Sequence, residues 1–530
     1  MNPKLSNLPK HQNNMSPRST PQVSALDMQY QSACLLMTSG QLQSARELFT
    51  EILKTDPTHL GTLINFAVLL TQTGYNSAAK TAYLQALVHH PKDLLAHINL
   101  ANLYFQERNF KEAENYYDQV LSLVHSEHGE NPIDKHVLSH YAHAHQGLAL
   151  IHFEEGDQAR ADFHHSRGYS IEPVRDYAVI KGATSKNMLV LIGGRGGDVP
   201  WPSFVDQSYF AVHTLAIEYL SKAQGIMNPL LSYDLIFNAI GDADSSLVSL
   251  KAAQDWLEQG PYIENKNIKN AAVNNAATGQ VNLSLKSSIS SGTFGLINPP
   301  SAVVLTGRKS NSERFKKLPF VKTPLTTVIA RKDFESAESL RKVMPLNFQF
   351  PVVFRSLGFQ TGKHFEFASS VEELFLKSGD LPGAELLVME FLNTRDEKGY
   401  YSKYRVMFID GEMYPLHLAL SKHWKVHYFS AAMKDSPENR GKEKFFLENM
   451  QLALGTTAIT ALKSIQNELG LDYAGVDFGL SAQGEVLVFE ANATMIMARP
   501  GADEMWDYRR TPILNARKAA QQMLIRRASR

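Results

Sequence analysis

Residues 471–492, LDYAGVDFGLSAQGEVLVFEAN, decide the fold of the second half of the chain. Two apolar runs flank a Gln-Gly pair, which predicts two strands joined by a tight turn. Asp477 falls on the first expected strand, and Glu490 and Asn492 fall on the second. Because residues two apart on a strand share a face, antiparallel pairing can bring Asp477 opposite the other two. Carboxylate and amide oxygens of this kind suit Mg²⁺ with a triphosphate, although an ordinary hairpin with a polar wet face has the same pattern.

The segments before this hairpin also read as strands and loops. An apolar run ends in the cation Arg355, a glycine-containing loop follows it, and a second apolar run has one acidic residue near its end. An Asp-Gly pair then predicts a further hairpin. These segments are Phe350–Arg355, Gly358–His364, Glu385–Leu392 and Tyr404–His417. A glycine loop over a cation is suited to covering phosphates.

Between residues 187 and 300 the pattern predicts an α/β domain. Asn187–Asp198 and Tyr233–Asp244 are apolar runs that end in polar loops, and Ser208–Ala223 between them has helical spacing. Ligands of such sheets bind at the carboxyl ends of the strands. The loop residues Arg195, Asp198, Asn238, Asp242 and Asp244 are therefore candidates to line the same cleft. Residues 265–298, rich in Asn, Ser and Ala, are expected to be an insertion.

The first half of the chain repeats with a period of 34 residues, the separation of Pro57 and Pro91. Small residues, a turn glycine and a closing proline recur in each unit, which predicts two helices per unit. The small residues are Ala33, Ala67, Ala101 and Ala149. Over residues 26–175 this pattern resembles the tetratricopeptide repeat, a solenoid whose concave face binds a peptide or protein partner. A rigid spacer or oligomerisation element is the alternative. The histidines around the fourth unit are interpreted as surface residues.

Composition excludes several classes of protein. The 530 residues carry 53 basic and 53 acidic side chains, so a chain-wide attraction to nucleic acid is not expected. The single cysteine, Cys34, excludes a disulfide framework and is typical of a reducing cytoplasm. No apolar run is long enough to span a membrane, and residues 1–25 are interpreted as a disordered tail.

Residues from about Asn187 to Pro500 resemble the ATP-grasp superfamily, in particular the glutathione-synthetase and RimK-like ligases. The resemblance rests on an Asp followed, after a strand-turn-strand spacing, by Glu-x-Asn. It implies ATP and Mg²⁺ as cofactors, an ATP-grasp domain over residues 301–500 and a C-terminal helix over 501–530. The metal ligands carry over as a set: Asp477, Glu490 and Asn492.

The resemblance also implies roles for cations and for a hinge strand. One phosphate-binding lysine falls on Arg355, and the other falls on Arg308 or Lys309. Arg405 matches an arginine that faces the γ-phosphate or the acyl phosphate. The adenine-binding hinge falls on Met389, Glu390, Phe391 and Leu392. Two departures stand out: Arg replaces Lys at 355, and Ala-Thr-Met-Ile-Met follows Asn492 where the family commonly has Ser-x-Pro-Gly.

The expected architecture is therefore multidomain: an α-solenoid, an α/β domain and an ATP-grasp domain. The implied activity is ligation of a carboxylate, possibly on a peptide, to an amine through an acyl phosphate, with release of ADP. Lys422 and His423, in the basic and aromatic segment after the Arg405 hairpin, are candidates to hold or deprotonate a substrate. A non-catalytic nucleotide-binding scaffold and an ATP-grasp phosphotransferase are the alternatives, and the family makes a homodimer plausible.

Overall fold

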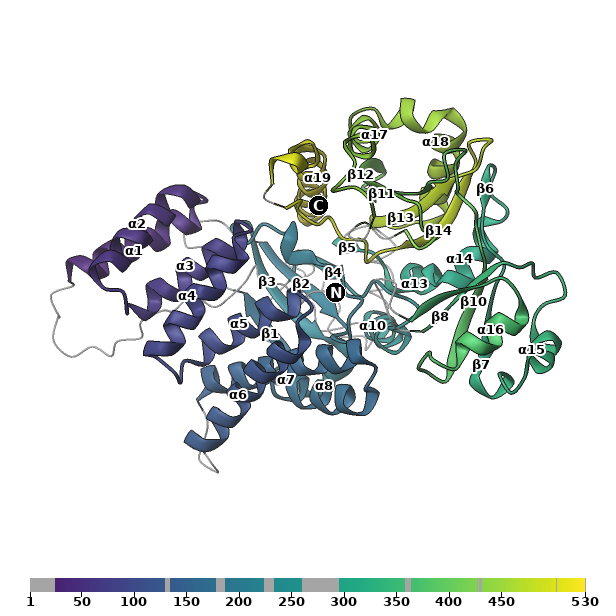
Figure 1. Ribbon diagram of the computed structural model, residues 1–530. Helices are drawn as coiled ribbons and strands as arrows, with labels where there is room; N and C mark the ends of the chain where they lie inside the picture. Colours follow the sequence, from purple (N-terminus) through teal and green to yellow (C-terminus); the bar gives the residue numbers. More distant parts are fainter. Residues whose placement is uncertain are drawn as a thin grey trace, which may run out of the picture. The chain divides into compact units, whose positions relative to one another are not determined.

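The computed structural model (Figure 1) describes residues 24–128, 134–177, 186–223, 233–259, 295–357, 364–426, 428, 431–501 and 503–529. The expected tail up to residue 23, the expected insertion up to residue 294 and most of the loop Gly358–His364 lie outside the described residues. The chain divides into two units, Asn2–Ala183 and Thr184–Arg530.

The described part of the first unit is a run of helices that pair in sequence order (Figure 1). They confirm the prediction of two helices per repeat. The pairs are α1 (Ala25–Thr38) with α2 (Leu42–Thr55), α3 (Leu60–Gln72) with α4 (Asn76–His89), α5 (Leu94–Gln106) with α6 (Phe110–His128), and α7 (Lys135–Glu155) with α8 (Gln158–Ile171). A short strand, β1 (Val174–Tyr177), follows them.

Small residues let these helices approach one another closely. The four repeated alanines, Ala33, Ala67, Ala101 and Ala149, are all buried. Gly147 is the tightest case, because a Cβ built on it would lie 2.2 Å from Cζ of the buried Tyr117 ring. Between the helices of three pairs the chain turns at a glycine in the left-handed region, namely Gly40, Gly74 and Gly156.

The third pair turns without a glycine. Arg108 lies 34 residues after Gly74 and adopts φ +61°, a conformation that is strained for a residue with a Cβ. Its guanidinium lies 5.1 Å from the centre of the Phe110 ring and donates to Glu154 at 3.0 Å. These contacts offset part of the backbone cost.

The prediction of surface histidines in the last repeat is only partly correct. His136 is exposed and His140, His143 and His164 are partly buried, but other histidines of α7 and α8 are not at the surface. His145, His152 and His165 are buried, because α7 and α8 turn these faces toward each other. Nδ1 of His145 lies 2.8 Å from Nδ1 of His164, so one ring must donate and the other accept. The described residues hold no group of three potential ligands arranged for a metal ion.

The second unit begins with a parallel sheet, in the order β3-β2-β4-β5. Its strands are β2 (Lys186–Ile192), β3 (Phe210–Ala216), β4 (Leu235–Asn238) and β5 (Gly295–Ile297), with α10 (Leu247–Gln259) following β4. The helix predicted over Ser208–Ala223 is wrong for its first half: Phe210–Ala216 is a strand (β3), and helical structure begins with a 3₁₀ turn at Ile217–Tyr219 followed by α9 (Leu220–Ala223). Strand β5 also shows that the expected insertion does not extend to residue 298.

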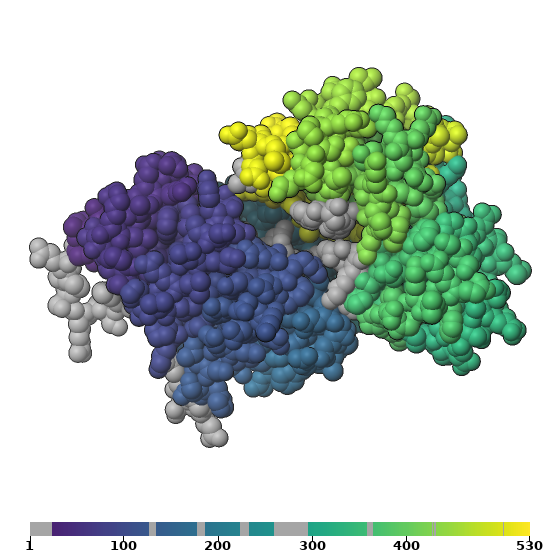
Figure 2. Space-filling view, viewed as in Figure 1, coloured from purple at the N-terminus to yellow at the C-terminus, as the bar shows by residue number. Residues whose placement is uncertain are grey.

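Two antiparallel sheets form the rest of this unit, and Figure 2 shows their segments as adjacent lobes. One has the order β7-β10-β8-β9 and the other β12-β11-β13-β14-β6, the last pair being parallel. The first sheet contains β7 (Thr326–Ala330), β8 (Val352–Ser356), β9 (Phe365–Ala368) and β10 (Glu385–Glu390). The second contains β6 (Val321–Lys322), β11 (Tyr401–Ile409), β12 (Glu412–Ser421), β13 (Tyr473–Leu480) and β14 (Val486–Asn492).

The hairpins predicted at Asp410-Gly411 and at Gln483-Gly484 are both confirmed. Helices connect and cover the sheets: α13 (Pro300–Val303), α14 (Arg308–Phe315), α15 (Ala337–Val343), α16 (Val371–Ser378), α17 (Pro437–Glu448), α18 (Met450–Leu469) and α19 (Arg510–Ala528), with a 3₁₀ turn at Glu504–Arg509. Among the described helices, none has the length and apolarity needed to cross a membrane.

The histidine pair gives the last repeat a pH-dependent stability. Burial, and then the neighbouring charges, lower the pKa of His145 and of His164 to about 4, whereas both titrate near 6.5 in an unfolded chain. The unfolded state therefore binds more protons as the pH falls below about 6.5, and stability is lost between that pH and about 4. The shift at the buried His145 corresponds to a loss of about 3 kcal/mol, and the partly exposed His164 adds less because solvent screens its charge.

Amide exchange in α7 and α8, corrected for intrinsic rates, measures this loss in the full chain. A variant with His145→Gln and His164→Gln should reduce the extra exchange at low pH. Part of it should persist, because burial also lowers the pKa of His140 and of His143 on α7. Equal acid sensitivity in α3 and α4, which lack the pair, would contradict the assignment.

Candidate functional site

Four polar side chains form a row across the second antiparallel sheet. Register places Glu490 of β14 opposite Asp477 of β13, Asp477 opposite Arg405 of β11, and Arg405 opposite His417 of β12. Cross-strand partners project from the same face of a sheet, so the row lies on one face. The register shifts directly after Asp477 and directly after Arg405. Irregularities of this kind bend strands and are common beside functional sites.

Asp477 is the most strongly paired member of the row. Its carboxylate accepts from Nε and Nη2 of Arg405 at 2.6 and 2.9 Å, and Nζ of Lys403 lies 2.8 Å from Oδ2. Burial alone would raise the pKa of Asp477, but Arg405 and Lys403 outweigh it and hold the pKa far below its usual value. The carboxylate is therefore ionised at any physiological pH.

Glu490 is held by a cation from α14 and by its own strand. One oxygen, Oε1, accepts from Nη2 of Arg308 at 2.7 Å and from Nδ2 of Asn492 at 2.7 Å. Burial acts to raise the pKa of Glu490, yet the charge of Arg308 leaves that pKa lowered overall. The amide oxygen of Asn492 accepts from the backbone N–H and the hydroxyl of Thr494, at 3.0 and 2.9 Å.

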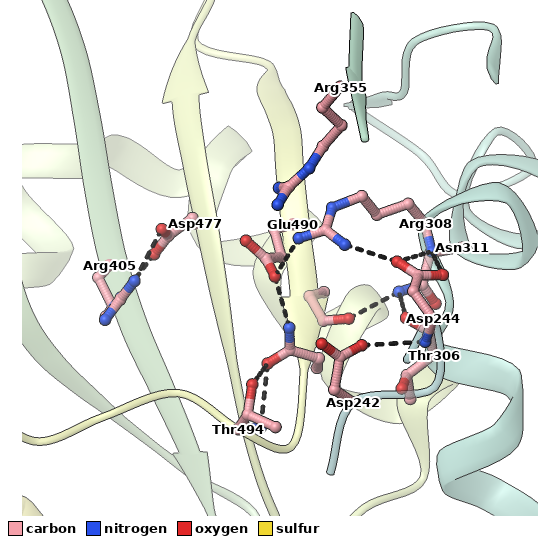
Figure 3. A network of polar contacts seen from close by, with 12 residues as sticks. Asp242, Asp244, Thr306, Arg308, Asn311, Arg355, Arg405, Asp477, Glu490 and Thr494 are labelled. Carbon is pink, nitrogen blue, oxygen red and sulfur yellow. Dashed lines mark hydrogen bonds and ion pairs between the residues drawn. The ribbon is translucent and has the colours of Figure 1, made fainter. Parts of the chain in front are cut away.

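Arg308 connects this row to the loop after β4 of the parallel sheet (Figure 3). Its Nη1 donates to Oδ2 of Asp244 at 2.6 Å, while its backbone N–H donates to Oδ1 of the same carboxylate at 3.1 Å. Asp242 lies beside this pair and is buried, which raises its pKa. The structure thus brings Arg308 to the site, whereas the alternative, Lys309, is exposed on α14.

Arg355 is a buried cation with spare hydrogen-bonding capacity. It ends β8, is 8% exposed, and in Figure 3 its guanidinium points toward the Glu490–Arg308 pair. Its Nη2 has no hydrogen-bond partner among the described residues. Burial, and then the like charge of Arg308, lower its pKa to about 10. An anion placed between the two arginines would accept a hydrogen bond from Nη2 of Arg355 and would offset the repulsion between the two positive charges.

The predicted hinge strand lies at the edge of the site. Met389 lines a cavity of about 20 Å³ together with Arg308 and Glu490. The side chain of Glu390 accepts from the backbone N–H of Gln349 and of Leu325, so it ties together the segments before β7 and β8. Phe391 packs edge-on against Phe367, and Leu392 follows it.

The structure does not bring Lys422 and His423 to the row. Both are exposed, and Nζ of Lys422 lies over the ring of Tyr400 at 5.2 Å. His427, another basic residue of this segment, lies outside the described residues. The position next to Arg405 belongs instead to His417. Sequence reasoning missed this role because both faces of β12 are buried near it, so no polar alternation marks the residue.

Comparisons with known proteins concern the first unit. Residues 94–125 match the family model of the tetratricopeptide repeat. MamA from Desulfovibrio magneticus is 18% identical over 28% of this chain and 75% of that one, with a TM-score of 0.24. A tetratricopeptide repeat protein from Parabacteroides merdae is 22% identical over 28% and 54% of the chains, also with a TM-score of 0.24. PilF from Pseudomonas aeruginosa is 16% identical over 28% and 61%, with the same TM-score.

No curated protein matches the chain. The N-terminal region consists of tetratricopeptide repeats, a protein-interaction architecture, and a mixed α/β region follows it.

The pairing of Asp477 predicts a large stability cost when its charge is removed. Asp477→Asn leaves Arg405 and Lys403 beside a neutral amide in a buried position, and we expect a loss of about 3–5 kcal/mol. Glu485→Gln is the matched control, because Glu485 is on the same hairpin and pairs with Lys322 near the surface. That change should cost less than about 1 kcal/mol. Urea unfolding measures both, and equal costs would contradict the buried ion-pair assignment.

Proposed function

We propose that the second unit contains an ATP-grasp domain, over residues 301–500, that binds ATP with Mg²⁺ and joins a carboxylate to an amine. The observation that carries this proposal is the meeting of Asp477, Glu490 and Asn492 with three arginines. Hard oxygen donors and guanidinium groups are the complementary halves of a metal–triphosphate site. The two antiparallel sheets that flank the site support the same assignment.

Two carboxylates of the row and the neighbouring amide of Asn492 are oxygen donors of the type that Mg²⁺ prefers. Asp477, Glu490 and Asn492 would hold the ion, which would supply charge neutralisation to phosphate oxygens. In their present state these donors are satisfied by other groups: Arg405 and Lys403 on Asp477, Arg308 on Glu490, and Thr494 on Asn492. Binding of a metal triphosphate therefore requires an exchange of partners, in which the cations turn from carboxylates to phosphates.

The cations would bind the phosphates of the nucleotide, and the hinge strand would bind its adenine. Arg355 and Arg308 offset charge on the α- and β-phosphates, and Arg405 faces the transferred phosphoryl group. Adenine would lie by Met389, Glu390, Phe391 and Leu392. The cavity beside Met389, about 20 Å³, has room for about one water molecule.

The proposed chemistry needs positioning and charge, with no covalent protein intermediate. An oxygen of the acid carboxylate bonds to the γ-phosphorus while the bond to the β–γ bridging oxygen breaks, and ADP leaves with that electron pair. The amine nitrogen then bonds to the acyl carbon. Phosphate leaves with the electron pair of the C–O bond, and the amine gives up a proton. The products are an amide, ADP and phosphate.

The tetratricopeptide repeats would bind a peptide or protein at their concave face, either as the substrate or as a partner that localises the enzyme. Homodimerisation and a cytoplasmic location remain part of the same proposal. No nucleic acid or membrane has a role in it.

A non-catalytic nucleotide-binding scaffold is the second candidate. The observation that favours it is that basic side chains pair directly with both carboxylates: Arg405 and Lys403 with Asp477, and Arg308 with Glu490. An ATP-grasp phosphotransferase would use the same nucleotide site, and release of ADP without an amide product would identify it.

Thermal unfolding with and without ATP and Mg²⁺ tests the nucleotide site. At about 100 times its dissociation constant, the ligand should stabilise the unit by about 2.7 kcal/mol. Glu490→Gln should remove the magnesium-dependent part of the shift, and Glu485→Gln should keep it. A folded wild-type protein with no shift would refute the ATP-grasp ligase and direct the search to partners of the repeats.

A further inference from the structure

His417 is the member of the polar row that the proposed chemistry does not use. It lies on β12 directly opposite Arg405, at the end of the sequence Glu490, Asp477, Arg405, His417 across the sheet. Asp477 and Glu490, which would hold the metal triphosphate, lie on the other side of Arg405 in this order, and Arg308 joins them through Glu490. His417 therefore flanks the site where a second substrate must approach.

Packing fixes the imidazole and leaves one nitrogen unsatisfied. His417 is 7% exposed, and its ring lies 4.9 Å from that of Tyr428. Arg509 lies over the same Tyr428 ring, with Cζ 4.1 Å from its centre, and pairs with the buried Glu443. Nδ1 of His417 has no hydrogen-bond partner in the described part of the chain. A buried polar nitrogen without a partner is costly and needs an explanation.

The charges around His417 indicate what kind of group would supply that partner. Burial, then Arg405, lowers the pKa of His417 well below its usual value, and Lys403 and Arg509 act in the same direction against Asp477. The ring is therefore neutral and carries one N–H. A neutral donor among three cations is a site for an anion and a poor site for an ammonium group.

Arg405 has one edge available for the same anion. It uses Nε and Nη2 on Asp477, and no hydrogen bond from its Nη1 is seen among the described residues. An oxyanion at this edge would sit between a guanidinium that also faces the transferred phosphoryl group and the imidazole on the next strand.

We propose that the carboxylate of the acid substrate binds between Arg405 and His417, with a ring N–H of His417 donating to one carboxylate oxygen. This inference rests on the proposed ligase function. The other oxygen is then directed past Arg405 toward the γ-phosphorus. His417 would orient the nucleophile and would select substrates that carry a carboxylate.

Acetate is the probe, because the natural acid is unidentified. The full chain, with ¹⁵N-labelled histidine side chains, is first loaded with ADP and Mg²⁺ and then titrated with sodium acetate. The ring signals of His417, assigned by their loss in His417→Phe, should shift in a saturable way. The signals of His90, a repeat histidine that contacts Thr58, should stay in place. Loss of a hydrogen bond to a charged group predicts that His417→Phe weakens acetate binding about tenfold or more.

His417→Asn restores an N–H donor near the position of Nδ1 and should recover most of the affinity for acetate. Both variants should bind ADP and Mg²⁺ as the wild type does. ADP binding with no acetate effect at His417 would overturn the inference and leave the nucleotide site standing. Shifts with inorganic phosphate alone would assign the position to the transferred phosphoryl group and would also overturn it. Absence of ADP binding would refute the proposed function together with this inference.

Discussion

The ion pair between Asp477 and Arg405 is the contact on which the organisation of the candidate site depends. The pair is buried within a sheet. Burial removes the solvation of the carboxylate, which would cost several kcal/mol if no cation compensated for it. Lys403 adds a second cation from the same strand as Arg405. Because both cations come from β11 and the carboxylate from β13, the pair determines which face of the sheet is polar. Glu490 and His417 extend that face on either side.

Charge balance explains why so many cations can be buried together. The site contains as many carboxylates as basic groups: Asp242, Asp244, Asp477 and Glu490 against Arg308, Arg355, Lys403 and Arg405. Asp244, Asp477 and Glu490 each have a cation at ion-pair distance. Arg355 is the least compensated of the cations, since its only described hydrogen bond is a long one to the Ser356 carbonyl. It is therefore the group with most to gain from an anionic ligand.

The sequence correctly predicted those helices and strands that follow from a local repeat of apolar, small and turn residues. The helix pairs follow from alanine and proline at a fixed period, and the β13–β14 hairpin follows from two apolar runs around a Gln-Gly turn. The helix predicted over Ser208–Ala223 was wrong for its first half because Phe210–Ala216 satisfies both a helical and an alternating pattern. Contacts between distant segments had no local signal: the partner of Arg308 is Asp244, and that of Arg405 is Asp477. The histidines of α7 and α8 were judged exposed because their partners lie on another helix.

The position of Arg405 opposite His417 also restricts how this hairpin can change in evolution. The two residues are joined through the Asp410–Gly411 turn, and the side chains of a strand alternate between faces. A bulge after Arg405 already gives β12 one residue more than β11 between the turn and the row, Glu412–Leu416 against Val406–Ile409. One added residue can thus be accommodated in a bulge. Two residues added to one strand would keep the face of the side chain but would place Arg405 opposite a different residue.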